Sequence, residues 1–350
     1  MDVTKKVFGY LEGQEVREYT LTNSQGVSLS ALSYGAIVTQ IMTPDKDGKQ
    51  ANITLNVDSL SDMVDHRPFY GAVIGRVAGR IAEGQYSIDG QPYSLPQNEG
   101  KSTLHGGFEG LDRKIWAVQT VQNEEAASLI FEYTSPEGES GFSGTVKIQV
   151  TYTLTEANEW IIDYRATTDK PTLFNPTNHV YFNLTGDVRT SILDHELQLN
   201  SPYFVPLNDQ NIPLGEWVKS QGTPFDFSQS KPLKEAVGSD DEQIKARSGL
   251  DHPFVLNSGG QGHQGKLFDP VSGRTVTFTT DRNSVVIFTH NAEVDDFTLF
   301  NEPVRQYAGI ALETQTLPDA VNQEGFGDTV IRPGQDFTSR TLYSFSCESH

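Results

Sequence analysis

Short runs of alternating apolar and polar residues recur along almost the whole chain, and they constrain its fold more than any other feature. The runs are rich in β-branched and aromatic residues and end at Gly, Pro, Asn or Asp, a pattern typical of strands and turns. The clearest are Glu18–Leu21, Ser28–Ala31, Ile37–Met42, Asn52–Val57, Ser128–Tyr133, Thr145–Leu154, Glu159–Thr167, Val276–Thr279 and Val285–Thr289. The 31 Gly and 17 Pro are dispersed, which indicates turns between strands and not a linker.

Helical periodicity is scarce and is confined to two short segments, Asp58–Asp65 and Leu233–Val237. Because parallel strands need long crossover connections, usually helices, a parallel sheet is not expected. The clearest hairpin joins Thr145–Leu154 to Glu159–Thr167, since both arms alternate and a short polar segment connects them. The polar segment Gly238–Gly249 is predicted to be a solvated loop.

A length of 350 residues would allow two domains, but an elaborated all-β sandwich can reach this size as one unit. A hydrophobic content of 36% with 10% aromatics is ample for a large core. No repeat of 20–50 residues is visible. The sequence therefore predicts an all-β fold, a single large antiparallel β-sandwich over residues 1–350.

The charge balance bears on partners. The formal net charge is −20, from 26 Lys and Arg against 46 Asp and Glu. Nucleic acids and anionic membranes select basic surfaces, so neither is an expected partner. A phosphorylated substrate is also disfavoured, and a small neutral molecule suits the charge best. The sequence carries no signal for an oligomeric state.

Cys347 is the one cysteine, so a disulfide within the chain and a cysteine-based metal site are excluded. We expect it to pack within a terminal strand, as free cysteines are often buried. The first residues hold no apolar run of signal-peptide length, and no stretch of about 18 apolar residues could span a membrane. A cytoplasmic location is expected.

Two of the eight histidines stand in unusual surroundings. His105 follows a polar turn-forming segment and precedes Gly-Gly, whereas His179 follows Asn-Pro-Thr-Asn and precedes Val-Tyr-Phe. A histidine at the mouth of a sheet can exchange a proton near neutral pH, but each could also simply be tied into a turn. His263 and His290 have no obvious partner and are predicted to be ordinary surface or turn residues.

Two carboxylates have comparable settings. Asp251 follows Gly-Leu and precedes His-Pro, and Glu313 ends an apolar run. A buried carboxylate needs partners and has a shifted pKa, so Glu313 is either functional or part of a strand-end salt bridge. Arg76 and Arg80 lie in Gly-Arg-Val-Ala-Gly-Arg-Ile, where the glycines favour an irregular strand or bulge. Walker, dinucleotide-binding, His-Glu-x-x-His and Gly-x-Ser-x-Gly motifs are absent from the sequence.

Taken together, these segments resemble the aldose 1-epimerase (galactose mutarotase) family. Five blocks match in order across almost the whole chain, and a weaker sixth is Phe288–Asn291. The five are Gly71–Ile81, Asn98–Gly107, Asn175–Leu184, Gly249–Phe254 and Gly309–Asn322. The ordered set is far more specific than any one motif.

The resemblance implies a large antiparallel β-sandwich with an open cleft that holds a sugar and interconverts its α and β anomers. It also implies that neither a cofactor nor a metal takes part. By position, Glu313 resembles the catalytic base that removes the C1 hydroxyl proton. His179 resembles the acid that protonates the ring oxygen, and His105 resembles the second histidine, which hydrogen-bonds at the reacting end. Opening a hemiacetal needs just such an acid and base.

The resemblance further implies a set of residues that bind the sugar. Arg80 and Asp251 match family positions that bind hydroxyls, and Asn98 and Asn178 are assigned to the same substrate-binding group. Hydrogen bonds from charged side chains to a neutral sugar are stronger than neutral pairs.

The sequence departs from the family pattern at several positions near these motifs. Gly79 and Ser102 stand where the family commonly has Asn, and Val180 stands in place of Ser. Val286 occupies the place of a substrate-contacting Gln, and Phe288 that of a Tyr. We hypothesise that these changes reshape the cleft for a different aldose or for a reducing disaccharide such as maltose.

Three other functions are compatible with parts of the pattern. A mutarotase-like enzyme for a hexose 6-phosphate would need clustered basic residues, and the charge argues against one. A non-catalytic carbohydrate-binding sandwich would not need an acid–base pair. A glycoside hydrolase could use Asp251 and Glu313 as its two carboxylates, although only their presence supports it.

Overall fold

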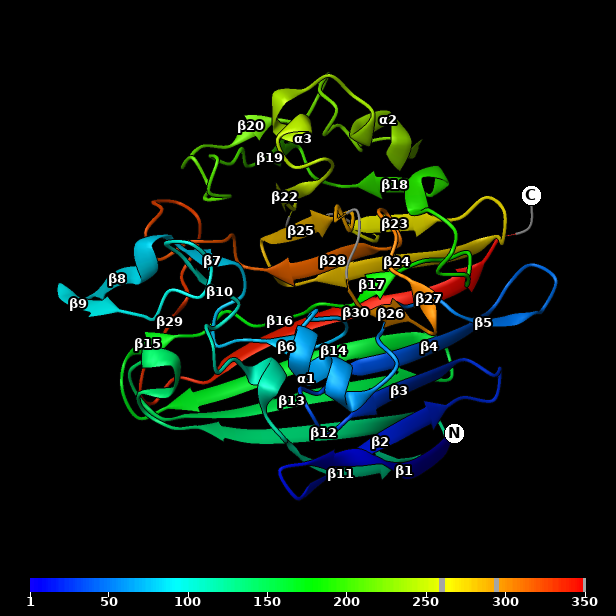
Figure 1. Cartoon of the computed structure of the whole chain (residues 1–350), viewed down its shortest axis with the longest axis horizontal. Coiled ribbons are helices and arrows are strands. Elements are labelled where there is room, and N and C mark those ends of the chain that lie inside the picture. The colour runs from blue at the N-terminus through cyan, green and yellow to red at the C-terminus, as the bar shows by residue number, and fades with distance from the viewer. Residues whose placement is uncertain (258–261, 293–295, 349–350) are drawn as a thin grey trace.

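The computed structural model describes residues 1–257, 262–292 and 296–348, and it is built almost entirely from β-strands. In the three large sheets of these residues, every pair of neighbouring strands is antiparallel. This confirms the predicted all-β, antiparallel sandwich. In Figure 1 the N-terminal strands lie at the bottom, and the segment with β18 to α3 lies at the top.

The first sheet has five strands in chain order: β1 (Asp2–Leu11), β2 (Gln14–Thr22), β3 (Ser28–Leu32), β4 (Val38–Pro44) and β5 (Gln50–Asn52). The second has nine strands, in the order β11 (Ala117–Gln122), β12 (Ala126–Ser135), β13 (Val146–Thr155), β14 (Glu159–Thr168), β30 (Phe337–Cys347), β24 (Arg274–Thr280), β23 (Gly265–Phe268), β18 (Glu196–Leu199) and β21 (Lys231–Pro232). The third has six strands, in the order β17 (Tyr181–Phe182), β28 (Ile310–Gln315), β25 (Ser284–Phe288), β22 (Asp251–Val255), β19 (Tyr203–Phe204) and β20 (Val218–Lys219).

Two-stranded ribbons and short helices connect these sheets. The ribbons pair β7 (Arg80–Ile81) with β10 (Thr103–Leu104), β6 (Val73–Ile74) with β16 (Thr177–Asn178), β8 (Gln85–Ile88) with β9 (Gln91–Ser94), β15 (Thr172–Leu173) with β29 (Val330–Ile331), and β26 (Thr298–Leu299) with β27 (Glu302–Pro303). The α-helices are α1 (Leu60–His66), α2 (Leu233–Val237) and α3 (Glu242–Lys245), and the single-turn 3-10 helices are Ala82–Gly84, Leu111–Arg113, Glu139–Gly141 and Ile192–Asp194. None of the helices within the described ranges is long and apolar enough to cross a lipid bilayer.

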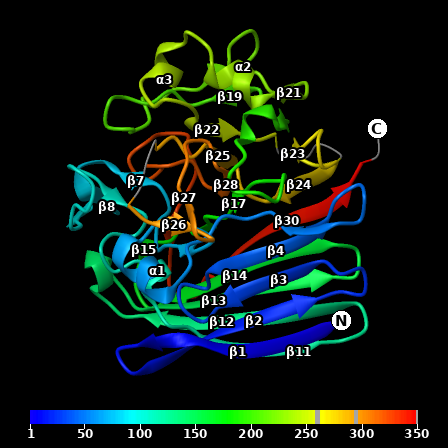
Figure 2. The same ribbon diagram turned by 45° about the vertical axis from the view of Figure 1, so that its right-hand side comes forward.

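The main core contains side chains from all three large sheets, and a large part of it lies between the five-stranded and nine-stranded sheets. Figures 1 and 2 both place β1–β4 beside β11–β14, and their inward side chains form one buried cluster. Phe131, Tyr152 and Trp160 come from the nine-stranded sheet, and Leu29 and Ile41 face them from the other. Each such side chain contributes about 1.5–3 kcal/mol by burial, so these sheets give the site a rigid base.

The predicted hairpin is confirmed: β13 and β14 pair from Val146–Thr168 to Leu154–Trp160. Helix α2 has the predicted bounds, whereas α1 runs from Leu60 to His66. Its start is set by Ser59, whose hydroxyl accepts a hydrogen bond from the Asp62 N–H at 3.1 Å. Serine at this position stabilises a helix by satisfying an otherwise unpaired N–H.

The predicted strand Asn52–Val57 is wrong beyond its first residue, since β5 ends at Asn52. After Asn52 the backbone pairs only through isolated bonds, such as that from the Ile53 N–H to the Ile41 carbonyl at 2.9 Å, and two asparagine side chains supply further ones. Asn52 Oδ1 accepts from the backbone N–H of Thr54 at 3.1 Å, and Asn56 Nδ2 donates to the Val38 carbonyl at 2.9 Å. Such local side-chain bonds compete with strand pairing.

The predicted solvated loop Gly238–Gly249 contains helix α3, so that prediction is corrected. The Asp241 side chain caps the helix by accepting from the Gln243 N–H at 2.8 Å, and Ile244 is buried. Gln243 also donates to the Leu207 carbonyl at 3.0 Å and accepts from the Leu207 N–H at 2.9 Å. The helix therefore fixes the Leu207 segment, which lines the cavity described below.

The expectation that Cys347 packs inside a terminal strand is only half right. It is the last residue of β30, but its side chain is exposed.

The six-stranded sheet positions the candidate site. Asp251 pairs with Phe288, Pro253 with Val286, and Val286 with Glu313. Because side chains alternate between the two faces of a strand, these five residues lie on one face of the sheet.

Candidate active site

A half-open cavity lies on this face of the six-stranded sheet and gathers most of the predicted site residues. His105, His179, Arg80, Asp251 and Glu313 all line it. They come from five segments far apart in the sequence, which the sheet and the ribbons bring together.

Glu313 lies inside β28, which pairs with β17 on one side and with β25 on the other. Its side chain is buried, with a residue exposure of 4%, which decides against a strand-end salt bridge at the surface. Burial, together with the nearby charge of Asp251, raises the pKa of the Glu313 carboxyl to about 8.

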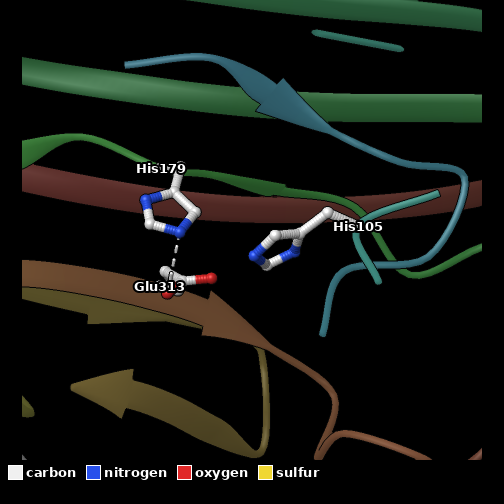
Figure 3. Close-up of side chains that lie close together, drawn as sticks. All are labelled: His105, His179 and Glu313. Atoms are coloured by element: carbon white, nitrogen blue, oxygen red, sulfur yellow. Dashed lines mark ion pairs between the residues drawn. The ribbon is translucent and has the colours of Figure 1, made fainter. Parts of the chain in front are cut away.

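His179 lies between β16 and β17, directly above Glu313 in Figure 3. Its backbone is held on both sides, since its N–H donates to the Ala72 carbonyl at 2.9 Å and its carbonyl accepts from Gly71 at 3.0 Å. Its Nε2 lies 3.3 Å from Oε1 of Glu313. Burial lowers the pKa of the His179 imidazole to about 4, so both members of the pair favour their neutral forms in the free protein.

His105 follows β10 and has a left-handed backbone, with a φ of +49°. Its N–H donates to the Gly79 carbonyl at 3.0 Å, and the Gly79 N–H donates to Nδ1 of the ring at 3.1 Å. Because Nδ1 accepts, Nε2 carries the proton of the neutral ring. Burial, aided by neighbouring His179, keeps the His105 pKa well below its usual range, so the ring is a neutral hydrogen-bond donor.

Gly106 makes the turn that carries His105 possible. A Cβ on Gly106 would lie 1.9 Å from the Gly75 carbonyl oxygen, and the backbone has a φ of +81°. Only glycine avoids both the clash and the strain.

Two aromatic side chains hold the imidazoles in place, and sequence reasoning missed both as site residues. Phe69 packs edge-on against His105, with ring centroids 5.0 Å apart, and lies 6.1 Å from His179. Tyr181 also stacks on His179, with ring centroids 5.0 Å apart. The strand pattern at Tyr181 and its place two residues after His179 could have indicated a common face.

Arg80 is fixed by a partner that the sequence did not reveal. Its Nε and Nη2 donate to the two carboxylate oxygens of Glu99 at 2.5 and 2.8 Å. Such a two-pronged pair sets the plane of the guanidinium. Asp251 lies on the cavity wall, where burial raises the pKa of its carboxyl against the opposing effect of Arg80.

Asn98 and Asn178 do not line the cavity, so the structure does not bring them to the predicted sugar-binding positions. The Asn98 amide makes two hydrogen bonds to the backbone of Leu104. It donates to the Leu104 carbonyl at 3.0 Å and accepts from the Leu104 N–H at 2.7 Å. Asn178 is buried and donates to the Gly71 carbonyl at 3.0 Å and to the Tyr152 hydroxyl at 2.9 Å. Both asparagines support the backbone beside a site histidine.

Arg76 and His290 also belong to the matched motifs, but both are buried and bond to other parts of the protein. Arg76 is buried away from the cavity and donates to the carbonyls of Ser135, Pro136 and Gly144. His290 is buried, with a ring nitrogen 2.6 Å from the Tyr70 hydroxyl, so its prediction as a surface or turn histidine was wrong. His263 is exposed, as predicted.

Three of the five departures from the family pattern lie at the cavity. Gly79, Val286 and Phe288 line it, whereas Ser102 and Val180 are buried elsewhere. These departures make this part of the wall apolar or leave it without a side chain.

His105, His179 and Glu313 offer two imidazole nitrogens and a carboxylate oxygen within 4.8 Å of one another, so these three could also hold a metal ion. In the free protein, the Glu313 oxygen and His179 Nε2 face each other at 3.3 Å. The same arrangement can pass a proton between carboxylate and imidazole. The site thus places a carboxyl group beside an imidazole, the two kinds of group that acid–base chemistry uses, on the wall of a half-open, partly apolar cavity.

Comparison with known proteins gives the family. The sequence model of the family described as aldose 1-epimerase matches residues 17–344. Galactose mutarotase of Rattus norvegicus is 35% identical over 352 residues, and maltose epimerase of Levilactobacillus brevis is 35% identical over 348 residues; both alignments cover 99% of each chain. The crystal structure of galactose 1-epimerase from Lactobacillus acidophilus superimposes with a TM-score of 0.90 at 30% identity, covering 99% of both chains.

The chain belongs to the aldose 1-epimerase family. It is an isomerase that interconverts the α and β anomers of an aldose.

Proposed function

We propose that this single-domain chain interconverts the anomers of a free hexose such as galactose or glucose, with Glu313 as base and His179 as acid. The observation that carries this proposal is the 3.3 Å approach of Glu313 Oε1 to His179 Nε2 on the wall of the cavity. One proton is shared by the pair at neutral pH. Its transfer from the carboxylic acid to the imidazole creates the carboxylate and the imidazolium that ring opening needs.

The proton movements balance over one cycle. Glu313 takes the O1 proton as the C1–O1 double bond forms, the C1–O5 electron pair leaves with O5, and His179 gives O5 its proton. The open aldehyde then rotates about C1–C2. On reclosure at the other face, the O5 proton returns to His179 and Glu313 returns a proton to O1. Each positioned proton transfer contributes about 10²–10⁴-fold to the rate.

His105, Arg80 and Asp251 have supporting roles in this proposal. The protonated Nε2 of His105 donates a hydrogen bond at the reacting end of the sugar, while Arg80 and Asp251 bind hydroxyls. Because Glu99 compensates the Arg80 charge and two further carboxyls line the cavity, a neutral sugar suits it better than a sugar phosphate.

A reducing disaccharide is the second candidate substrate. It is supported by Gly79, Val286 and Phe288, which make part of the cavity wall apolar or open, and by the similarity to a maltose epimerase. A cytoplasmic location remains part of the proposal.

Polarimetry of freshly dissolved α-galactose, α-glucose and α-maltose tests both candidates. Wild type should speed the approach to equilibrium on at least one sugar, and Glu313→Gln should abolish this. Thr314→Val is a matched control, because it also removes a buried hydrogen-bonding group from β28, but on the face opposite to Glu313. The Thr314 hydroxyl lies 2.6 Å from Thr341 Oγ1, and this variant should retain activity. A plain preference for galactose refutes the disaccharide hypothesis. If wild type is inert on all three sugars, the proposed reaction is refuted, and calorimetric binding would then identify a sugar-binding protein.

A further inference from the structure

Gln315 is a fully buried side chain with unused hydrogen-bonding capacity. It ends β28, its residue exposure is 0%, and it lines the cavity. Within the part of the chain that the structure describes, neither Oε1 nor Nε2 has a hydrogen-bond partner. A buried unpaired amide costs about 1–3 kcal/mol per group, so such groups usually have a ligand or a water to bond.

The surroundings of the amide are small or apolar on the side of Gly79. A Cβ on Gly79 would lie 3.5 Å from Gln315 Nε2 and 3.1 Å from Pro318 Cβ. Gly79 therefore offers no side chain to the amide, and Pro318 adds no donor there. A polar group of a ligand that enters the cavity is therefore the partner that the Gln315 amide can bond.

The position of Gln315 along β28 indicates which part of the sugar it can reach. It lies two residues after Glu313, so both side chains are on the same face, about 7 Å apart along the strand. If Glu313 holds O1, that spacing corresponds to the opposite edge of a hexose ring. An amide offers a donor and an acceptor together, which suits a hydroxyl group.

We infer that Gln315 is a specificity-determining residue that binds the hydroxyl on C3 or C4 of the sugar. The inference rests on the proposed function, because it places O1 at Glu313. It adds a direct ligand to the cavity beyond Arg80 and Asp251. Sugar binding then satisfies an amide that is unpaired in the free protein, which favours substrates with a hydroxyl at that position.

Gln315→Met tests this inference, because methionine keeps the length of the side chain and removes both hydrogen-bonding groups. We expect KM for the preferred monosaccharide to rise at least tenfold, with kcat changed less than about threefold. The melting temperature of the free protein should not fall, since no partner is lost. With 3-deoxyglucose or 4-deoxyglucose, the ratio of kcat/KM between wild type and variant should return to about one, whereas 2-deoxyglucose and 6-deoxyglucose should keep the full effect.

Thr314→Val is the matched control, since it removes a hydrogen bond from the neighbouring position of β28 on the opposite face. Its KM should stay at the wild-type value. An unchanged KM in Gln315→Met overturns the inference, and so does an equal loss with all four deoxy sugars. A lower melting temperature with unchanged KM would assign the amide a structural role instead. If Gln315→Met is insoluble, Gln315→Leu takes its place under the same criteria.

The failure of the proposed function can be told apart from the failure of this inference. Inactive wild type refutes the proposed function, whereas active wild type whose KM is unchanged by Gln315→Met refutes only this inference.

Discussion

Replacing Glu313 by Gln should remove catalysis and, at neutral pH, stabilise the fold. The folded carboxyl has a pKa of about 8 against an ordinary value of 4.5, because it is buried. A carboxyl whose pKa is raised by folding contributes stability that is fully present below pH 4.5 and is lost as the pH rises through about 8. Glutamine is neutral at every pH and escapes this loss.

The magnitude follows from the pKa shift. Between pH 4.5 and pH 7, the contribution of this carboxyl to the free energy of unfolding of wild type falls by roughly 1.4 kcal/mol per pH unit. The total decrease over this range is about 3 kcal/mol. For a chain of 350 residues, the entropy of unfolding is roughly 0.7 kcal/mol per degree, so the difference in melting temperature should grow by about 4 °C over this range. The His179 imidazole stays buried in both proteins, so its contribution largely cancels.

The assay is thermal unfolding of wild type and Glu313→Gln, followed by circular dichroism at pH 4.5, 5.5, 6.5 and 7.5 in matched ionic strength. The quantity to compare is the variant-minus-wild-type difference at each pH. Thr314→Val is the control, and its difference from wild type should not depend on pH.

A constant difference between wild type and Glu313→Gln across this range would refute the reasoning. It would mean that the carboxyl keeps an ordinary pKa when folded. A variant that becomes relatively less stable as the pH rises would mean that Glu313 is an ionised partner in a stabilising ion pair. Retained mutarotase activity in the folded variant would separately remove Glu313 from the mechanism.

Three further predictions follow from the same geometry. Because the Glu313–His179 pair works with one shared proton, kcat/KM should be bell-shaped, falling below about pH 4 and above about pH 8, when measured by polarimetry after subtraction of spontaneous mutarotation. Glu99→Gln should weaken the two-pronged hold on Arg80 and raise KM about tenfold with kcat nearly unchanged in steady-state kinetics; a large fall in kcat alone would contradict this role. Dialysis against EDTA should leave the rate unchanged, since the proposed chemistry uses only side-chain protons, and lost activity restored by Zn²⁺ would contradict it.

The alternation of apolar and polar residues was sufficient to predict the strands that are paired along their whole length. β13 and β14 alternate along most of their length, because each has one face in the main core, so the period agrees with prediction and the bounds agree to within one residue. The pattern failed after Asn52, where regular pairing ends and the side chains of Asn52 and Asn56 bond the backbone beside isolated backbone bonds. It also missed α3, a single turn held by Asp241 and by contacts with a distant segment.

The sequence by itself also determined which chemical groups the site contains. The resemblance of their motifs to the aldose 1-epimerase family identified His105, His179, Glu313, Asp251 and Arg80, and the fold brings all five to one cavity. Such motifs are recognisable because a reactive group needs particular neighbours in the chain, such as the glycine that allows the turn after His105.

Only the tertiary structure decided how these groups are partnered. Glu99, Phe69 and Tyr181 reach the site from other segments, and Asn98 and Asn178 turn out to hold backbone instead of lining the cavity. A partner across space leaves no periodic signal in the chain, and an amide serves backbone and ligand equally well. Burial likewise depends on how the sheets assemble. It raises the pKa of Glu313 to about 8, and among the described residues it leaves the Gln315 amide without a hydrogen-bond partner.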